Sequence, residues 1–276
     1  MRVSIASFSF HGLIAEGEMD LFGYLESCQF RYGIESADIW NGLLASTDND
    51  YIKKVRDALD EREMVCANYH ADGPNVWDDD PGVRDRNYKS ALEHLRIAEM
   101  LGARTMRIDT GGVVGPMTDE QFNLLVSRYG EYARFGANAG FAVGPENHWG
   151  VSLIADSMER IAKAVGHPNY GILLHIGHWE DGDEESGDRR LAPWTIHTHV
   201  DARVTRTRLE PAMEILRDAG YEGYWGVEHH SGKNEYREVA CQLAAVERVL
   251  AAWGPAGRGK SVPREGPLNP LLPHLD

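Results

Sequence analysis

Apolar residues along the chain gather in eight short runs, and a segment with a different periodicity follows almost every one of them. The runs are rich in Val, Ile, Leu and Phe, which is typical of strands that are buried on both faces. The predicted strands are Arg2–Ser7, Gly33–Ile39, Met64–Tyr69, Thr105–Asp109, Phe141–Glu146, Gly171–His175, Thr195–His199 and Tyr224–Glu228.

Between the predicted strands, apolar residues recur at spacings of three and four, which predicts amphipathic helices. Glycines such as Gly102 and Gly140 stand where these patterns fail and mark the expected helix ends. The predicted helices are Met19–Tyr32, Asp50–Glu61, Arg86–Leu101, Thr118–Ala139, Ser152–Val165, Glu210–Ala219 and Glu235–Trp253. The segment Glu180–Arg190 is acidic and contains glycines, so we predict a loop there.

The alternation of strands and helices favours one closed (β/α)8 TIM barrel over an open doubly wound sheet. We predict that the barrel domain covers residues 1–253. Residues 254–276 are rich in Pro and Gly and are predicted to form an irregular C-terminal tail. The tail is either disordered or lies over a neighbouring subunit, because its leucines would otherwise face water.

Composition narrows the range of partners. The 276 residues carry 43 acidic and 28 basic side chains, a formal net charge of −15. This charge repels phosphate groups, and no apolar stretch reaches the roughly 20 residues of a membrane span, so we expect neither nucleic acid nor membrane as a partner. The N-terminus has no signal-peptide pattern, and Cys28, Cys66 and Cys241 are irregularly spaced. Both features predict a cytoplasmic protein with buried, reduced cysteines.

Acid or imidazole side chains stand at the ends of four successive predicted strands. They are Glu146, His175, His199 and Glu228. The C-terminal ends of barrel strands converge on one mouth, where two carboxylates and two imidazoles match the ligands of a divalent metal ion. A single carboxylate at a strand end more often belongs to a structural salt bridge. Acid or imidazole side chains at four successive strand ends favour a metal site instead. His197 precedes His199 by two residues, so it points to the same face and is predicted to pack or hydrogen-bond beneath it.

Other side chains that follow the strands are candidates for catalysis or substrate binding. His148 is a candidate base, with a hydrogen-bonding role beside the metal ligands as the alternative. Trp149 and Trp179 are candidates to stack on a sugar ring or an aryl group, although a single tryptophan is more often a packing residue. His11 and His70, which follow the first and third strands, are weaker candidates for substrate contact.

Four motifs resemble those of the xylose isomerase-like sugar isomerase and epimerase barrels. They are Glu-Asn-His (146–148), Gly-Ile-Leu-Leu-His-Ile-Gly-His (171–178), His-Thr-His-Val-Asp (197–201) and Gly-Tyr-Trp-Gly-Val-Glu (223–228). The resemblance covers residues 1–252 and is sharpest from Gly140 to Gly232. It implies a xylose isomerase-like barrel that binds one Mn²⁺, Mg²⁺ or Co²⁺ through Glu146, His175, His199 and Glu228. It also implies that His178 contacts substrate and that Arg203 or Arg206, in the loop after His199, supplies a cationic contact.

The chain departs from the family at His175, where the family usually has aspartate. If His175 is a ligand, the imidazole leaves the ion more positive and favours Mn²⁺, Co²⁺, Fe²⁺ or Zn²⁺ over Mg²⁺, with Mn²⁺ as the first expectation. The alternative is that His175 does not bind the metal.

The site type predicts proton removal next to the carbonyl of a keto sugar, with Glu146 and Glu228 as catalytic acids and bases. The first hypothesis is a metal-dependent isomerase or epimerase. The second is a lyase of the same fold, such as an inosose or dehydroshikimate dehydratase or the catalytic subunit of a 3-oxo-C-glycoside deglycosidase. A DNA-repair endonuclease, which the negative charge disfavours, and a binding protein with a vestigial site are further alternatives. We expect a small sugar or glycoside as substrate, and a homo-oligomer or a complex with a small second subunit.

Overall fold

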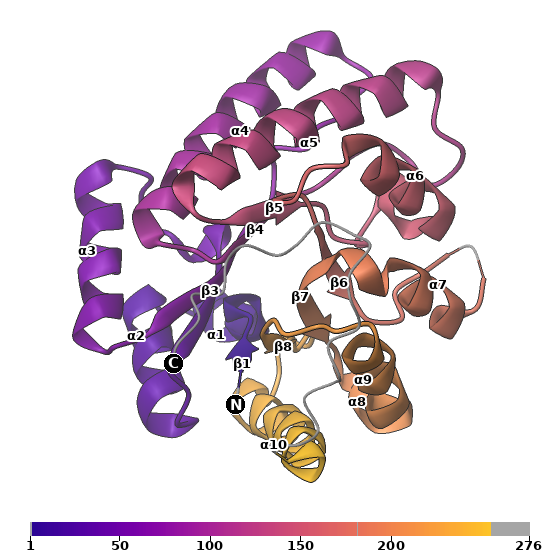
Figure 1. The fold of residues 1–276 in the computed structure, drawn as a ribbon. Helices are drawn as coiled ribbons and strands as arrows, with labels where there is room; N and C mark the ends of the chain where they lie inside the picture. The colour runs from indigo at the N-terminus through magenta and orange to yellow at the C-terminus, as the bar shows by residue number, and fades with distance from the viewer. Residues whose placement is uncertain (1, 181, 255–276) are drawn as a thin grey trace.

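The computed structural model describes residues 2–180 and 182–254. Its strands lie in the centre of the molecule (Figure 1). They are β1 (Val3–Ile5), β2 (Ser36–Trp40), β3 (Val65–Ala71), β4 (Thr105–Ile108), β5 (Ala142–Gly144), β6 (Ile172–His175), β7 (Thr195–Val200) and β8 (Trp225–Val227). Each predicted strand is therefore present, with bounds that differ by a few residues.

The strands pair in parallel to form a closed barrel. Hydrogen bonds order them as β1-β8-β7-β6 and as β2-β3-β4-β5. A bridge between Ala6 and Asp38 joins β1 to β2. Bridges from Val143 to Tyr170 and from Glu146 to Leu173 join the β5 and β6 sides. These bridges complete the ring and confirm the predicted (β/α)8 TIM barrel.

Helices surround the barrel (Figure 1). They are α1 (His11–Ala15), α2 (Leu21–Glu26), α3 (Asn49–Glu61), α4 (Pro81–Leu101), α5 (Asp119–Ala139), α6 (Ala155–Val165), α7 (Glu184–Leu191), α8 (Ala202–Thr207), α9 (Leu209–Asp218) and α10 (Glu235–Trp253). Helix α5 shows why they form: Thr118 and Gln121 make a capping box at its start, and Gly140 ends it with φ 86°. None of the helices in the described residues is long and apolar enough to cross a membrane.

One close contact between strands requires glycine. A Cβ atom on Gly144 at the end of β5 would lie 1.7 Å from the carbonyl oxygen of Gly171, which precedes β6. Any side chain there would force the two strands apart. Glu146 lies just after β5 and His175 is the last residue of β6. Gly144 therefore helps to set the distance between the two strands that carry these candidate site residues.

The structure corrects several predictions. Residues 184–191 form α7 rather than a loop, because Asp183 caps the helix and acidic residues begin it while Arg189 and Arg190 end it. Helix α4 begins at Pro81 behind the capping Asp80, earlier than Arg86. Cys28 and Cys66 are buried, but Cys241 on α10 is exposed, contrary to expectation. The predicted tail lies outside the described residues except for Gly254.

Candidate metal centre

The four predicted metal ligands come from consecutive strands and meet at the C-terminal mouth of the barrel. His175 ends β6 and pairs in register with His199 of β7, which in turn pairs with Gly226 of β8. Glu146 lies just after β5 and Glu228 directly after β8. All four side chains are buried, with relative exposures of 1% to 6% for the two carboxylates. The barrel thus brings together residues that are up to 82 positions apart (228 − 146).

The donor atoms of these side chains face a common point. Glu146 Oε1 lies 3.1 Å from His175 Nδ1 and 3.0 Å from His199 Nδ1. Glu228 Oε2 lies 3.5 Å from His175 Nδ1 and 3.3 Å from His199 Nδ1. One donor atom from each of the four residues falls within 4.8 Å of all the others. Each imidazole is therefore placed between two carboxylate oxygens.

This arrangement fits a divalent metal ion. Bonds of about 2.0–2.1 Å place neighbouring ligands about 2.8–3.4 Å apart in octahedral or tetrahedral shells, close to the distances between these atoms. Two nitrogen and two oxygen donors suit Mn²⁺, Fe²⁺, Co²⁺ or Zn²⁺ better than Mg²⁺, which prefers oxygen. The ring nitrogen of His175 points to the same place as that of His199. His175, which departs from the family pattern, therefore lies where a fourth ligand could be supplied.

The pKa values of the clustered side chains are shifted by burial and by the charges of their neighbours. Burial alone would raise the pKa of Glu146 and of Glu228, but the neighbouring histidines, His199 first among them, together hold the pKa of both carboxyls well below their usual range. Burial would lower the pKa of His199, yet Glu228, Glu146 and Asp38 raise it well above the ordinary imidazole value. Two buried carboxylates therefore demand a cation between them, which either a proton on His199 or a metal ion can supply.

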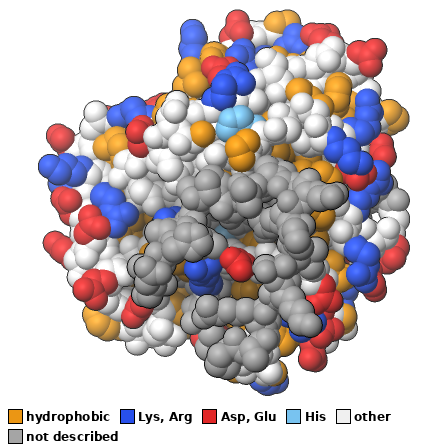
Figure 2. Space-filling view, in the orientation of Figure 1, with side chains coloured by type: hydrophobic (Ala, Val, Ile, Leu, Met, Phe, Trp, Pro, Cys, Tyr) orange, Lys and Arg blue, Asp and Glu red, His pale blue; other side chains and the backbone are white. Residues whose placement is uncertain are grey.

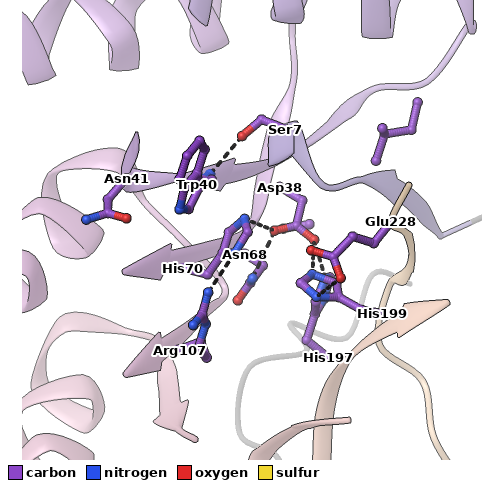
Figure 3. A network of polar contacts seen from close by, with 12 residues as sticks. Ser7, Asp38, Trp40, Asn41, Asn68, His70, Arg107, His197, His199 and Glu228 are labelled. Carbon is purple, nitrogen blue, oxygen red and sulfur yellow. Dashed lines mark hydrogen bonds and ion pairs between the residues drawn. The ribbon is translucent and has the colours of Figure 1, made fainter. Parts of the chain in front are cut away.

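A second set of polar side chains lies beneath the cluster, and sequence reasoning anticipated it only in part. His197 hydrogen-bonds to Asp38 of β2, with Nε2 2.7 Å from Oδ2, as its predicted position beneath His199 suggested. His199 Nε2 lies 3.2 Å from the same oxygen (Figure 3). Gly226 makes room for both rings, because a Cβ atom there would lie 3.0 Å from His197 Nε2 and 2.4 Å from the carbonyl oxygen of Thr198. The role of Asp38 was not predicted.

Asn147 fixes the end of β6 to the end of β5. Its Oδ1 accepts a hydrogen bond from the backbone N–H of His175 at 2.7 Å. Its Nδ2 donates to the carbonyl oxygens of His175 at 2.8 Å and of His178 at 3.0 Å. The Glu-Asn-His motif thus combines a metal-ligand candidate with the amide that holds the neighbouring ligand in place. The sequence showed the motif but not this division of roles.

A buried arginine closes the β4 side of the site. Arg107 of β4 pairs with Asp109 and with Asp72, and its Nε lies 3.4 Å from Glu146 Oε2. Its Nη2 lies 3.1 Å from Nδ1 of His70, a predicted substrate residue that is only 1% exposed. Burial lowers the pKa of His70 to about 4 and raises that of Asp109 to about 7. Asp109 and His148 form a further group with Glu146, but Arg107 already provides the cation there.

Three other predicted residues border the cluster. His148 Nδ1 lies 3.9 Å from Glu146 Oε2, and burial lowers the pKa of His148 to about 4. The rings of His148 and Trp149 stack with centroids 3.9 Å apart, and Trp149 is 41% exposed. The ring of His178 lies 4.9 Å from that of His175. His230, which was not predicted, contacts Glu228 Oε2 at 2.9 Å.

Arg203 and Arg206 lie on the short helix α8 rather than in a loop. With Lys233 and with His230, whose Nε2 contacts Glu228, they line a cavity of about 720 Å³. Arg203 pairs with Glu184, and Arg206 pairs with Glu238. On the face of the molecule that Figure 2 shows, basic and acidic side chains are interspersed around the periphery.

The two remaining predicted substrate residues are engaged elsewhere. Trp179 is buried in the core, where its Nε1 donates to Asp188 at 3.0 Å and its ring covers Gly187, so it is no part of an exposed aromatic wall. His11 stacks on Phe8, and its Nδ1 lies 2.9 Å from the carbonyl oxygen of Phe8. Neither residue contacts the four converging side chains.

Sequence comparison assigns the chain to a family. The model of the xylose isomerase-like TIM barrel family matches residues 31–245, and the chain belongs to this family. No curated protein matches the chain by sequence.

Solved structures share the fold at low sequence identity. A D-tagatose 3-epimerase-like protein superposes with a TM-score of 0.73 and 16% identity, over 91% of this chain and 98% of the other. The IolI protein with a bound zinc atom superposes with a TM-score of 0.72 and 12% identity, over 91% of this chain and 97% of the other. The probable 3-DHS dehydratase AsbF from Bacillus anthracis superposes with a TM-score of 0.69 and 14% identity, over 90% of this chain and 99% of the other. These similarities describe the fold, and the neighbours include both epimerase-like and dehydratase-like proteins.

Proposed function

We propose that the protein is a divalent-metal-dependent sugar isomerase or epimerase that moves a proton next to the carbonyl of a keto sugar. The observation that carries this proposal is the convergence of Glu146, His175, His199 and Glu228 on one point. The similarity in fold to a D-tagatose 3-epimerase-like protein and to zinc-bound IolI agrees with it.

In this proposal the four converging side chains hold the ion, with Mn²⁺ as the first choice. The bound ion would polarise the carbonyl and stabilise negative charge as the proton leaves. Glu146 and Glu228 enter the cluster from β5 and β8, on either side of the two histidines, so each can hold or release a proton at the substrate. His178 and Trp149 border the site and are proposed to position the substrate. His178 Nδ1 is buried and has no hydrogen-bond partner among the described residues.

A lyase that acts on an oxidised sugar is the second candidate. His148 offers a base outside the four-residue cluster, because its Nδ1 is buried and has no hydrogen-bond partner among the described residues. An exposed aromatic ring lies beside it, because Trp149 stacks on His148. A substrate with an apolar leaving group, such as an aryl glycoside, would match this surface.

The remaining assignments stay predictions. We propose a small sugar or glycoside as the ligand and the cytoplasm as the location. A homo-oligomer or a complex with a small second subunit is likewise proposed from sequence.

Proton exchange in D₂O tests the proposal directly. The protein with Mn²⁺ is incubated with a panel of keto sugars and followed by NMR. Deuterium uptake with inversion identifies an epimerase, migration of the carbonyl an isomerase, and loss of water or an aglycone a lyase. We expect the first or second result, and the absence of exchange with every sugar would contradict the proposed chemistry.

A further inference from the structure

Asp38 reaches across the barrel from β2 to two histidines of β7 (Figure 3). Its side chain is fully buried. Its Oδ2 lies 2.7 Å from His197 Nε2 and 3.2 Å from His199 Nε2. These are hydrogen-bond distances, and both bonds connect residues about 160 positions apart in sequence.

Asp38 is held in place from behind. Its Oδ1 accepts a hydrogen bond from Asn68 Nδ2 of β3 at 2.9 Å. Thr105 Oγ1 of β4 donates to Asn68 Oδ1, also at 2.9 Å. A line of polar contacts therefore runs from β4 through β3 and β2 to β7, directly below the candidate metal centre. A buried polar line of this kind fixes side-chain orientation more strongly than apolar packing does.

The two ring nitrogens of His199 face different partners. Nε2 faces Asp38, whereas Nδ1 faces Glu146 Oε1 at 3.0 Å and Glu228 Oε2 at 3.3 Å. With a metal ion held between Nδ1 and the two glutamates, a neutral imidazole would present its lone pair at Nδ1 and carry its one proton on Nε2, where the Asp38 carboxylate accepts it.

We propose that Asp38 is a positioning residue that keeps the His199 proton on Nε2 and so makes Nδ1 available to the metal. The inference rests on the proposed metal centre but not on the reaction that it catalyses. Asp38, His197 and His199 also form a group of potential ligands. Because Oδ2 is already hydrogen-bonded to both rings, we assign Asp38 to support of the ligand rather than to a second metal site.

The test is the affinity of the full-length protein for Mn²⁺ after Asp38→Asn, a substitution of similar size. Free Mn²⁺ is measured by electron paramagnetic resonance during titration. Loss of such a carboxylate partner is expected to weaken metal binding about 10–100-fold. In the Zn²⁺-loaded protein, the downfield ¹H–¹⁵N signal of the His199 Nε2–H group should shift upfield, which a purely structural change elsewhere would not produce.

Ser36→Ala is the matched control for a general loosening of β2. Ser36 lies two residues before Asp38, is buried, and bonds to the carbonyl oxygen of Val3 rather than to a histidine. Its variant should bind Mn²⁺ as the unmodified protein does. Should Asp38→Asn fail to fold, Asn68→Ser replaces it and should show a smaller loss of affinity in the same direction.

The role of Asp38 would be overturned if Asp38→Asn left both the Mn²⁺ affinity and the Nε2–H signal unchanged. If Asn68→Ser has to be used instead, an unchanged Mn²⁺ affinity in that variant would overturn it. An equal loss in Ser36→Ala would also overturn it. A protein that binds Mn²⁺ tightly but exchanges no proton with any keto sugar refutes the proposed function and leaves the role of Asp38 intact. The two failures are therefore distinguishable.

Discussion

Glu228→Gln and Glu146→Gln are each expected to abolish proton exchange into keto sugars while the protein still folds. Each substitution removes a carboxylate that is both a proposed metal ligand and a proposed proton carrier. Loss of a positioned acid or base alone slows a reaction about 10²–10⁴-fold, and the weaker metal binding of an amide adds to this effect. The measurement is the initial rate of deuterium uptake at saturating Mn²⁺, with circular dichroism as the check of folding.

Glu235→Gln is the matched control for these two variants. Glu235 is also buried, and its oxygens accept hydrogen bonds from the backbone N–H groups of Gly12 and Leu13 at 2.7 and 2.9 Å. It has no contact with the four converging side chains, so its variant should lose stability but keep the rate per folded molecule. Full activity in Glu146→Gln or Glu228→Gln would remove that carboxylate from the mechanism.

Arg107→Met is expected to lower the free energy of unfolding by about 3–5 kcal/mol, which is the cost of leaving buried charges unpaired. The guanidinium is 2% exposed and faces Asp109, Asp72 and Glu146. Methionine fills a similar volume but supplies no charge and no hydrogen bond. Urea denaturation of the metal-free protein measures the difference.

Two further variants make this prediction specific. Adding Asp109→Asn to Arg107→Met should restore part of the lost stability, because it removes a buried carboxylate that has lost its partner. Arg84→Met removes an arginine that pairs with the exposed Glu120 at 2.9 Å and should cost less than about 1 kcal/mol. A loss for Arg107→Met as small as that for Arg84→Met would show that Arg107 does not neutralise the site.

The fold was predictable because its signals are local. Each strand lies in or beside a short apolar run of the sequence, and α5 carries a capping box at its start and a glycine at its end. Helix α7 was missed because it buries little apolar surface and relies on Asp183 and on charges at its two ends. The spacing of apolar residues does not reveal such a helix. The capping aspartate, together with acidic residues at the start and basic residues at the end, would have indicated it.

The candidate site was predictable only where its residues repeat at strand ends. Glu146, His175, His199 and Glu228 could be found because each follows an apolar run and barrel topology brings strand ends together. Asp38 could not be found in this way, because its partners lie on β7 and the pairing depends on how side chains fill the barrel interior. Trp179 was misjudged for the related reason that position after a strand does not tell whether a ring faces the mouth or the core.

The central claim is that one divalent ion is held jointly by side chains from β5 to β8. Anomalous diffraction at the manganese edge from crystals soaked in MnCl₂ tests it most directly. The account predicts a single strong peak within bonding distance of Glu146, His175, His199 and Glu228. A soaked crystal with no peak there, or one in which these side chains lie apart from one another, would contradict it.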